Sequence, residues 1–316
     1  MGYTPPQQRP PVPPQTPYGP TAIPAPPPRR RFRWGALLLI IVIVVTGALL
    51  RSALRTGLDA LGSGDRVTTG YDDDPGTLGV AETAGNPLVT DDDATLIPAQ
   101  CDYSPWSTRV ETARKFFESA ATCLEAAWKP VFTDINLPFE PPKVNVSAST
   151  TGITTLCTGN STDFAAFYCS ADKTIYMPIS QLQTDVFQDN WVVYLSVFAH
   201  EYGHHVQAQS GILGKVHAQR REAGARTDTG LELSRRTELQ ANCFDGMYLA
   251  SSKGGGSLSA NQIEIARTDA YHRGDGPGDM RDHGTTANGG AWWEVGYDEN
   301  RTAQCNTFTA PASKVN

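Results

Sequence analysis

The sequence predicts an α+β domain that follows a single transmembrane helix. An uncharged apolar run near the N-terminus predicts the transmembrane helix. After residue 100, three long segments repeat apolar residues at helical spacing, and short segments between the first two alternate as strands do. All six cysteines follow the apolar run, as expected if only this part of the chain is exported.

Residues 1–33 are predicted to form a disordered tail on the cytoplasmic side of a membrane. Residues 1–28 contain 12 of the 23 prolines, and such a tract has too little apolar surface for a packed core. The tail is therefore either simply solvated or a docking segment for a proline-binding partner. A cluster of four arginines closes it: Arg29, Arg30, Arg31 and Arg33.

Residues 34–50 are predicted to form the transmembrane helix. At about 1.5 Å per residue this run spans roughly 25 Å, just enough for the apolar core of a bilayer. The arginines before it should remain in the cytoplasm. A cleaved signal peptide is disfavoured because the preceding tail is too long, and a buried core helix because arginines flank the run. We therefore expect a single-pass protein of the cell membrane, with a cytoplasmic N-terminus and an extracytoplasmic C-terminal domain.

Residues 51–99 are predicted to form an acidic, flexible linker, with nine acidic and three basic residues and no sustained periodicity after about residue 61. Its aspartate runs at 72–74 and 91–93 lack the spacing of a calcium loop, so we interpret them as solvated spacer. The folded domain is expected at residues 100–310. The formal net charge of -7 gives no indication of a nucleic-acid partner.

The cysteine count predicts three disulfides in the exported part of the chain. Fifteen pairings are possible, and the pairing of sequence neighbours is one hypothesis. No C-x-x-C motif occurs, so a zinc site built from cysteines is disfavoured. The hypothetical pairs are Cys101–Cys123, Cys157–Cys169 and Cys243–Cys305.

The first half of the folded domain predicts one helix and a small sheet. The helix is expected over residues 107–129, with Pro130 at its end. Strands are expected at 143–149 and 173–177, and a disulfide-stapled hairpin or loop at 157–170 lies between them.

The most informative segment is the helix predicted over residues 189–210, which Gly211 ends as a C-terminal cap. Apolar residues on two opposite faces predict that this helix is buried. His200 and His204 lie four residues apart, so both imidazoles reach one metal ion. Their burial predicts that they are neutral and bound to a partner. Glu201 is placed to take a proton from a metal-activated water.

A catalytic zinc site needs a third protein ligand. We expect it in a second helix, over residues 230–251, where Glu238, Asn242 and Asp245 recur on one face. Glu238 is the candidate ligand, and Asn242 is the candidate partner for the free ring nitrogen of a histidine. His205 points about 100° away from its neighbour and is expected to support the site from behind or to lie at the surface.

Four motifs, HEYGHHVQ, TELQANCFDG, DHGT and CNTF, together resemble those of the bacterial proteins described as putative neutral zinc metallopeptidases. The resemblance covers about residues 100–310. It implies a zincin-like domain with the gluzincin arrangement, in which H-E-x-x-H is followed by E-x-x-x-D. It further implies that Zn²⁺ is bound by His200, His204 and Glu238, and that Glu201 is the general base.

Two positions need separate interpretation. Asn242 replaces the aspartate of the family pattern, so its amide oxygen would accept a histidine N–H without a charge, unless Asp245 takes over that role. His283 in the DHGT motif is the candidate catalytic donor to the tetrahedral oxyanion, the alternative being a surface histidine in a glycine-rich loop. Tyr271 and His272 are weaker candidates.

Metallopeptidases of this general type bind an extended substrate along an edge strand that precedes the metal-binding helix. The strand at residues 173–177 is either that edge strand or an ordinary strand of the sheet.

The sequence therefore predicts a membrane-anchored zinc metallopeptidase that hydrolyses peptide bonds in a peptide or protein substrate. The alternative is a catalytically weak or inactive zinc-stabilised module that binds cell-envelope proteins, motivated by Asn242 and by the altered loop after His283. A cell-wall enzyme is disfavoured because no wall-binding repeat is visible. Substrate preference and oligomeric state are left open.

Overall fold

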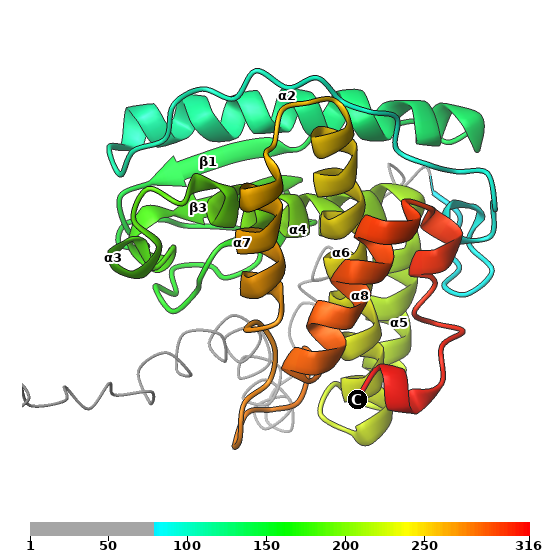
Figure 1. Ribbon diagram of the computed structural model, residues 1–316. Coiled ribbons are helices and arrows are strands. Elements are labelled where there is room, and N and C mark those ends of the chain that lie inside the picture. The colour runs from blue at the N-terminus through cyan, green and yellow to red at the C-terminus, as the bar shows by residue number, and fades with distance from the viewer. Residues whose placement is uncertain (1–78) are drawn as a thin grey trace, which may run out of the picture. The chain divides into compact units, whose positions relative to one another are not determined.

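The helix that carries the two histidines runs beneath a small sheet and against a second long helix (Figure 1). The computed structural model describes residues 79–316. The predicted tail, the predicted transmembrane helix and most of the predicted linker lie outside these residues. Between residues 79 and 316, no helix combines the length and the apolar character needed to cross a membrane.

The domain is built from six longer helices and three short strands, with one short helix and four 3₁₀ turns between them. The helices are α2 (Val110–Asp134), α3 (Thr184–Phe187), α4 (Trp191–Ser210), α5 (Ile212–Ala223), α6 (Asp228–Gly254), α7 (Ala260–Ala270) and α8 (Thr286–Glu299). The strands are β1 (Lys143–Ser147), β2 (Phe167–Cys169) and β3 (Thr174–Pro178). The 3₁₀ turns are η1 (Pro87–Val89), η2 (Ile179–Gln181), η3 (Thr302–Cys305) and η4 (Ala312–Lys314). This confirms the expected helix-rich domain with a small sheet.

The sheet has the strand order β1-β3-β2, with β1 parallel and β2 antiparallel to β3. All five residues of β3 are buried, as expected for the central strand. The interpretation of residues 173–177 as the edge strand is therefore wrong. The edge strand beside α4 is β2, within the segment that was predicted only as a stapled hairpin or loop.

Helix α2 runs past Pro130, where it was expected to end. Proline in a helix interior costs about 3 kcal/mol, because it lacks the N–H of a helical hydrogen bond. The next two residues, Val131 and Phe132, are 2% and 0% exposed. Burying each contributes about 1.5–3 kcal/mol, which offsets the cost of the proline for one more turn.

Residues 79–99 belong to the folded domain, so the prediction of a flexible linker is wrong for this part of the chain. Leu88 and Leu96 are buried in the core. The Asn86 side chain donates a hydrogen bond to the carbonyl oxygen of Ser210 at the end of α4 (2.9 Å). Apart from the single turn η1, the segment packs as irregular coil, and such a segment leaves no periodic signal in the sequence.

All three disulfides predicted from sequence neighbours are confirmed: Cys101–Cys123, Cys157–Cys169 and Cys243–Cys305. The last one joins α6 to η3 across 62 residues of sequence.

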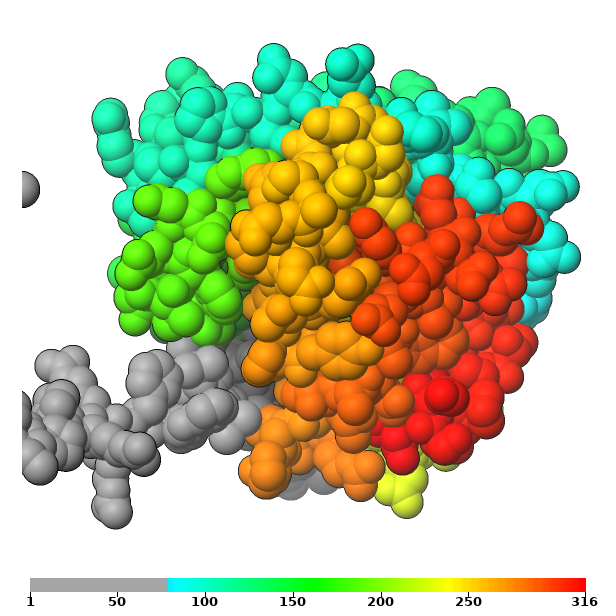
Figure 2. All heavy atoms as spheres, viewed as in Figure 1, coloured from blue at the N-terminus to red at the C-terminus, as the bar shows by residue number. Residues whose placement is uncertain are grey.

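Helices α6 and α8 pack with their backbones in contact, and α7 and α8 make up much of the face seen in Figure 2. A Cβ atom at Gly246 of α6 would overlap the Trp293 carbonyl oxygen of α8. A Cβ atom at Gly296 of α8 would overlap the Cys243 carbonyl oxygen of α6. These two glycines therefore set the distance between the helices.

We expect Gly246→Ala to lower the free energy of unfolding by about 1–3 kcal/mol, because the added methyl group forces the two helices apart. The matched control is Gly214→Ala in α5, where a Cβ atom has nothing within 4 Å. Since glycine in a helix interior is less stable than alanine, this control should gain about 0.5–1 kcal/mol. Denaturant unfolding measures both; an unchanged stability of Gly246→Ala would contradict the close packing.

Candidate functional site

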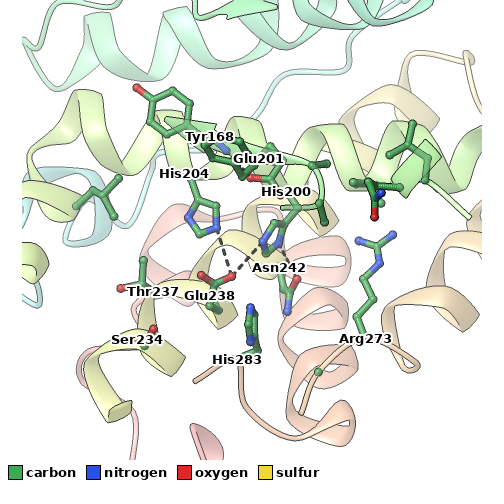
Figure 3. Close-up of a pocket in the computed structure, with 18 of the residues that line it drawn as sticks. Tyr168, His200, Glu201, His204, Ser234, Thr237, Glu238, Asn242, Arg273 and His283 are labelled. Atoms are coloured by element: carbon green, nitrogen blue, oxygen red, sulfur yellow. Dashed lines mark hydrogen bonds and ion pairs between the residues drawn. The ribbon is translucent and has the colours of Figure 1, made fainter. Parts of the chain in front are cut away.

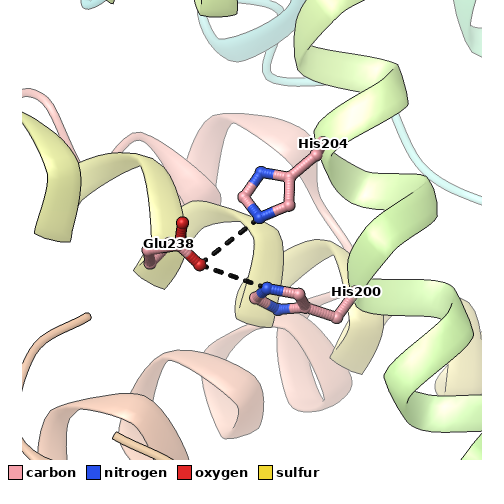
Figure 4. A group of neighbouring side chains, drawn as sticks. All are labelled: His200, His204 and Glu238. Carbon is pink, nitrogen blue, oxygen red and sulfur yellow. Dashed lines mark ion pairs between the residues drawn. The ribbon is translucent and has the colours of Figure 1, made fainter. Parts of the chain in front are cut away.

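The packing of α4 against α6 brings the three predicted metal ligands together. The Nε2 atoms of His200 and His204 each lie 3.3 Å from Oε2 of Glu238 (Figure 4). The histidines come from α4 and the glutamate from α6. One nitrogen or oxygen of each side chain lies within 4.8 Å of the others.

Two side-chain amides set the tautomers of the histidines. His200 Nδ1 lies 2.8 Å from Oδ1 of Asn242, and His204 Nδ1 lies 2.8 Å from Oε1 of Gln207. Gln207 donates through its nitrogen to the Thr237 carbonyl oxygen, so its oxygen must face the histidine. An amide oxygen only accepts, so each Nδ1 carries a proton, and each Nε2 is left to bind a metal ion or, when protonated, Glu238.

The contact predicted for Asn242 is therefore present, whereas the role suggested for Asp245 is wrong. Asp245 is fully buried and faces α4 and α8, where it accepts hydrogen bonds from Ser196 and Trp293 instead of from a histidine. Sequence reasoning missed Gln207. The sequence did contain a signal for this contact, because Gln207 follows His204 by three residues and therefore lies on the next turn of the same helix face.

The three converging side chains fit a zinc ion. Two imidazole nitrogens and one carboxylate oxygen are a common ligand set of catalytic zinc. Burial lowers the pKa of His200 to about 4. Burial also lowers the pKa of His204, but the neighbouring Glu238 carboxylate outweighs it and raises that pKa to about 9. Although burial opposes it, the two histidines hold the pKa of Glu238 well below its ordinary value. The three groups thus favour a positive charge where they converge.

Glu201 lies beside the ligand pair and is 8% exposed. Its Oε2 accepts a hydrogen bond from the backbone N–H of Tyr168 in β2 (2.9 Å). Burial raises the pKa of Glu201 to about 7, and the charge of His204 opposes that shift. The site therefore contains a carboxylate that binds a proton readily near neutral pH and is fixed through one oxygen.

His205 is completely buried. Of its two expected positions, the one that supports the site from behind is therefore correct, and the surface location is wrong. Its Nε2 lies 2.6 Å from the Glu140 carbonyl oxygen and its Nδ1 lies 3.0 Å from the Tyr168 hydroxyl. A carbonyl only accepts, so Nε2 donates and Nδ1 accepts the tyrosine proton. His205 thereby holds β2 against α4.

His283 faces the ligand group from the opposite side, with its ring pointing toward Glu238 and Asn242 (Figure 3). Its Nδ1 lies 2.9 Å from Asp282 Oδ1 and 3.4 Å from Asp275 Oδ1. Against the cost of burial, these two carboxylates raise the pKa of His283 well above its ordinary value. His283 is therefore a charged imidazolium inside the site and not a surface histidine.

The two weaker candidates differ from His283 in position. The Tyr271 hydroxyl donates to Glu294 at the surface, and Tyr271 does not line the cavity. His272 does line the cavity, and its Nδ1 hydrogen-bonds the Thr268 carbonyl oxygen.

One cavity of about 440 Å³ lies along α4, with β2 on one side and α6 on another (Figure 3). It is lined by the ligand group and its closest polar neighbours: His200, His204, Glu238, Glu201, Asn242 and His283. Its two ends differ in chemistry. Beside the N-terminal half of α4 the apolar lining residues are accompanied by two glutamines and by an arginine that is paired with Asp269: Leu182, Phe187, Val193, Val197, Gln181, Gln183 and Arg273. Beyond His204 it is mixed, with apolar, hydroxyl and cationic side chains: Leu213, Val216, His217, Arg220, Ser234 and Thr237.

Comparison with known proteins agrees with this geometry. The sequence profile of the family described as putative neutral zinc metallopeptidase matches residues 88–308. The chain belongs to this family.

The similar proteins carry names that give no activity. The uncharacterized protein YpfJ of Escherichia coli strain K12 is 31% identical over 218 residues, which cover 64% of this chain and 74% of that protein. The uncharacterized protein Rv2575 of Mycobacterium tuberculosis strain H37Rv is 31% identical over 216 residues, which cover 59% of this chain and 68% of that protein. No solved structure matches the chain.

The resemblance to this family implies an aspartate at the position that Asn242 occupies. We expect Asn242→Asp to tighten zinc binding, because a carboxylate accepts the His200 N–H more strongly than an amide does. Asn242→Leu should weaken it by about 10- to 100-fold, since the ring loses its orienting partner. Competition with a chromogenic chelator measures both affinities. Equal affinities of the leucine variant and the wild type would rule out an orienting role for Asn242.

Proposed function

We propose that this protein is a zinc metallopeptidase that hydrolyses peptide bonds in the cavity between α4, α6 and β2. The observation that carries the proposal is the convergence of His200, His204 and Glu238 in one cavity with Glu201 and His283. Zinc, when bound by these three ligands, polarises the scissile carbonyl and lowers the pKa of the attacking water.

Glu201 acts as the general base and then as the general acid. Its carboxylate accepts the proton of the attacking water and passes it to the leaving amine. The Tyr168 N–H holds Oε2, which leaves Oε1 for the proton. Burial supports this role because it raises the proton affinity of the carboxylate toward neutral pH.

His283 stabilises the oxyanion of the tetrahedral intermediate. Asp275 and Asp282 hold its Nδ1 and keep the ring charged, so its Nε2–H is available for a developing negative charge. The Asp275 carboxylate also fixes the loop, since it accepts the backbone N–H groups of His283 and Gly284.

An extended peptide binds along β2. Within residues 79–316 this strand is one of the two edges of the sheet, the one beside α4, and the Tyr168 backbone faces the site. An edge strand offers unpaired backbone groups to an extended chain. Pairing with β2 would lay a scissile bond over the ligand group.

The proposed location is the outer side of the cell membrane, anchored by residues 34–50 with the N-terminus in the cytoplasm. Three disulfides in residues 101–305 support an oxidising compartment for the domain.

We expect Glu201→Gln to retain zinc and to lose hydrolysis by a factor of about 10²–10⁴, because the amide cannot accept the proton. Glu238→Ala should lose zinc instead. The measurements are metal content and cleavage of a peptide library by the full-length protein, with the exposed Glu222→Gln of α5 as the control that changes neither. Zinc-loaded wild-type protein that cleaves nothing, yet captures cell-envelope proteins, would favour a zinc-stabilised binding module.

We expect His283→Asn to lower kcat by about 10²–10³ with little change in KM, because the lost donor acts mainly on the transition state. Zinc content should stay at the wild-type level. Tyr271→Phe is the matched control, since its ring lies outside the cavity. If kcat of His283→Asn equals that of the control, His283 does not stabilise the oxyanion.

A further inference from the structure

A half-buried cation, Arg220, lines the cavity at the end beyond His204. Arg220 lies near the C-terminus of α5, and its Nε donates to the Gly230 carbonyl oxygen (3.1 Å). Its Nη2 is buried and has no hydrogen-bond partner within residues 79–316. A buried donor without an acceptor costs about 1–3 kcal/mol, so an acceptor entering the cavity here would be stabilised.

Within the part of the chain that the structure describes, no carboxylate forms an ion pair with Arg220. The nearby carboxylates that act on it are those of Asp282 and Glu238, and neither forms an ion pair with it. Asp282 is paired with His283, and Glu238 is paired with the histidines of α4. When the two histidines and Glu238 hold a metal, the glutamate is further committed. The guanidinium is therefore available to a negatively charged group.

The strand directions show which side of the scissile bond would face Arg220. Glu140 forms an ion pair with Lys173, the residue just before β3, and its carbonyl oxygen hydrogen-bonds His205 in the C-terminal half of α4. The start of β3 therefore lies beside that half of α4. β3 ends toward α3 and the start of α4 (Figure 1). It therefore runs opposite to α4, and the antiparallel β2 runs with α4. A peptide paired antiparallel to β2 has its N-terminal side toward α5.

Resting on the proposed peptidase function, we propose that Arg220 selects substrates with an acidic side chain on the N-terminal side of the scissile bond. The planar guanidinium matches a carboxylate, and Leu213 and Val216 provide an apolar wall for the methylene groups of the side chain. The buried hydroxyl of Ser234 adds a neutral polar group at the same end. A lysine at this substrate position would be repelled.

The test uses the zinc-loaded full-length protein and peptides that differ only in Glu, Gln or Lys, placed in turn at each position on both sides of the cleaved bond. We expect kcat/KM at one N-terminal-side position to favour Glu over Gln by about tenfold or more, because a hydrogen bond to a charged group is worth about 1.5–3 kcal/mol. Lys should be the poorest of the three.

Arg220→Gln should bring the Glu-to-Gln ratio close to one. The exposed neighbour Arg221→Gln is the matched control and should keep the wild-type ratio. Arg220→Lys, which keeps the charge and loses the planar fork, should give an intermediate ratio and serves if the glutamine variant fails to fold.

Three outcomes would overturn the inference: equal cleavage of Glu and Gln peptides by the wild type, an unchanged ratio in Arg220→Gln, or a preference confined to the C-terminal side. An unchanged ratio with a uniform loss of activity would mean that Arg220 only supports Asp282.

Absence of any cleavage is instead a failure of the proposed function. Fluorescence anisotropy with zinc-loaded Glu201→Gln then decides the inference alone, since tighter binding of the Glu peptide supports it and equal binding overturns it.

Discussion

The close approach of α4 and α6 is the constraint on which the candidate site depends. A Cβ atom at Gly203 would lie 3.2 Å from Cα of Ala241, which is tighter than ordinary packing allows. Glycine at this position lets the two backbones meet. His200 lies one turn before Gly203, His204 follows it directly, and Glu238 lies one turn before Ala241. The three side chains are therefore close enough to share one ion. A longer distance between the helices would leave three buried polar side chains without a common partner.

The orientation of the ligands is tied to the covalent frame of the domain. Gln207, which orients His204, hydrogen-bonds Gln240 of α6 (3.0 Å). Gln240 in turn donates to the Cys305 carbonyl oxygen (3.1 Å), and Cys305 is disulfide-bonded to Cys243. The C-terminal segment is thus connected to a histidine of the site through two side-chain amides. Such fully satisfied networks hold ligand geometry because each member has one favourable arrangement.

Two arginines line the cavity, and their surroundings give them different roles. Arg273 hydrogen-bonds Ser196 and Asp269 and lies 3.7 Å from the buried Asp245. Its charge is balanced by two carboxylates, so it stabilises the buried acids behind α4. Arg220 has no such contact among the residues from 79 onward. The difference in local pairing distinguishes a structural guanidinium from one that can bind a substrate.

The sequence by itself determined what depends on local spacing. The four-residue separation of the histidines, the cap at Gly211 and the register of Glu238 with Asn242 follow from helix geometry, and the structure agrees with each. Only the tertiary structure decided what depends on contacts between distant segments. These include the central place of β3, the packing of residues 79–99 and helices α5, α7 and α8, which the sequence analysis did not include. The availability of Arg220 is of the same kind. Side-chain periodicity reports which residues share a face of one element, but it carries no information about which other element covers that face.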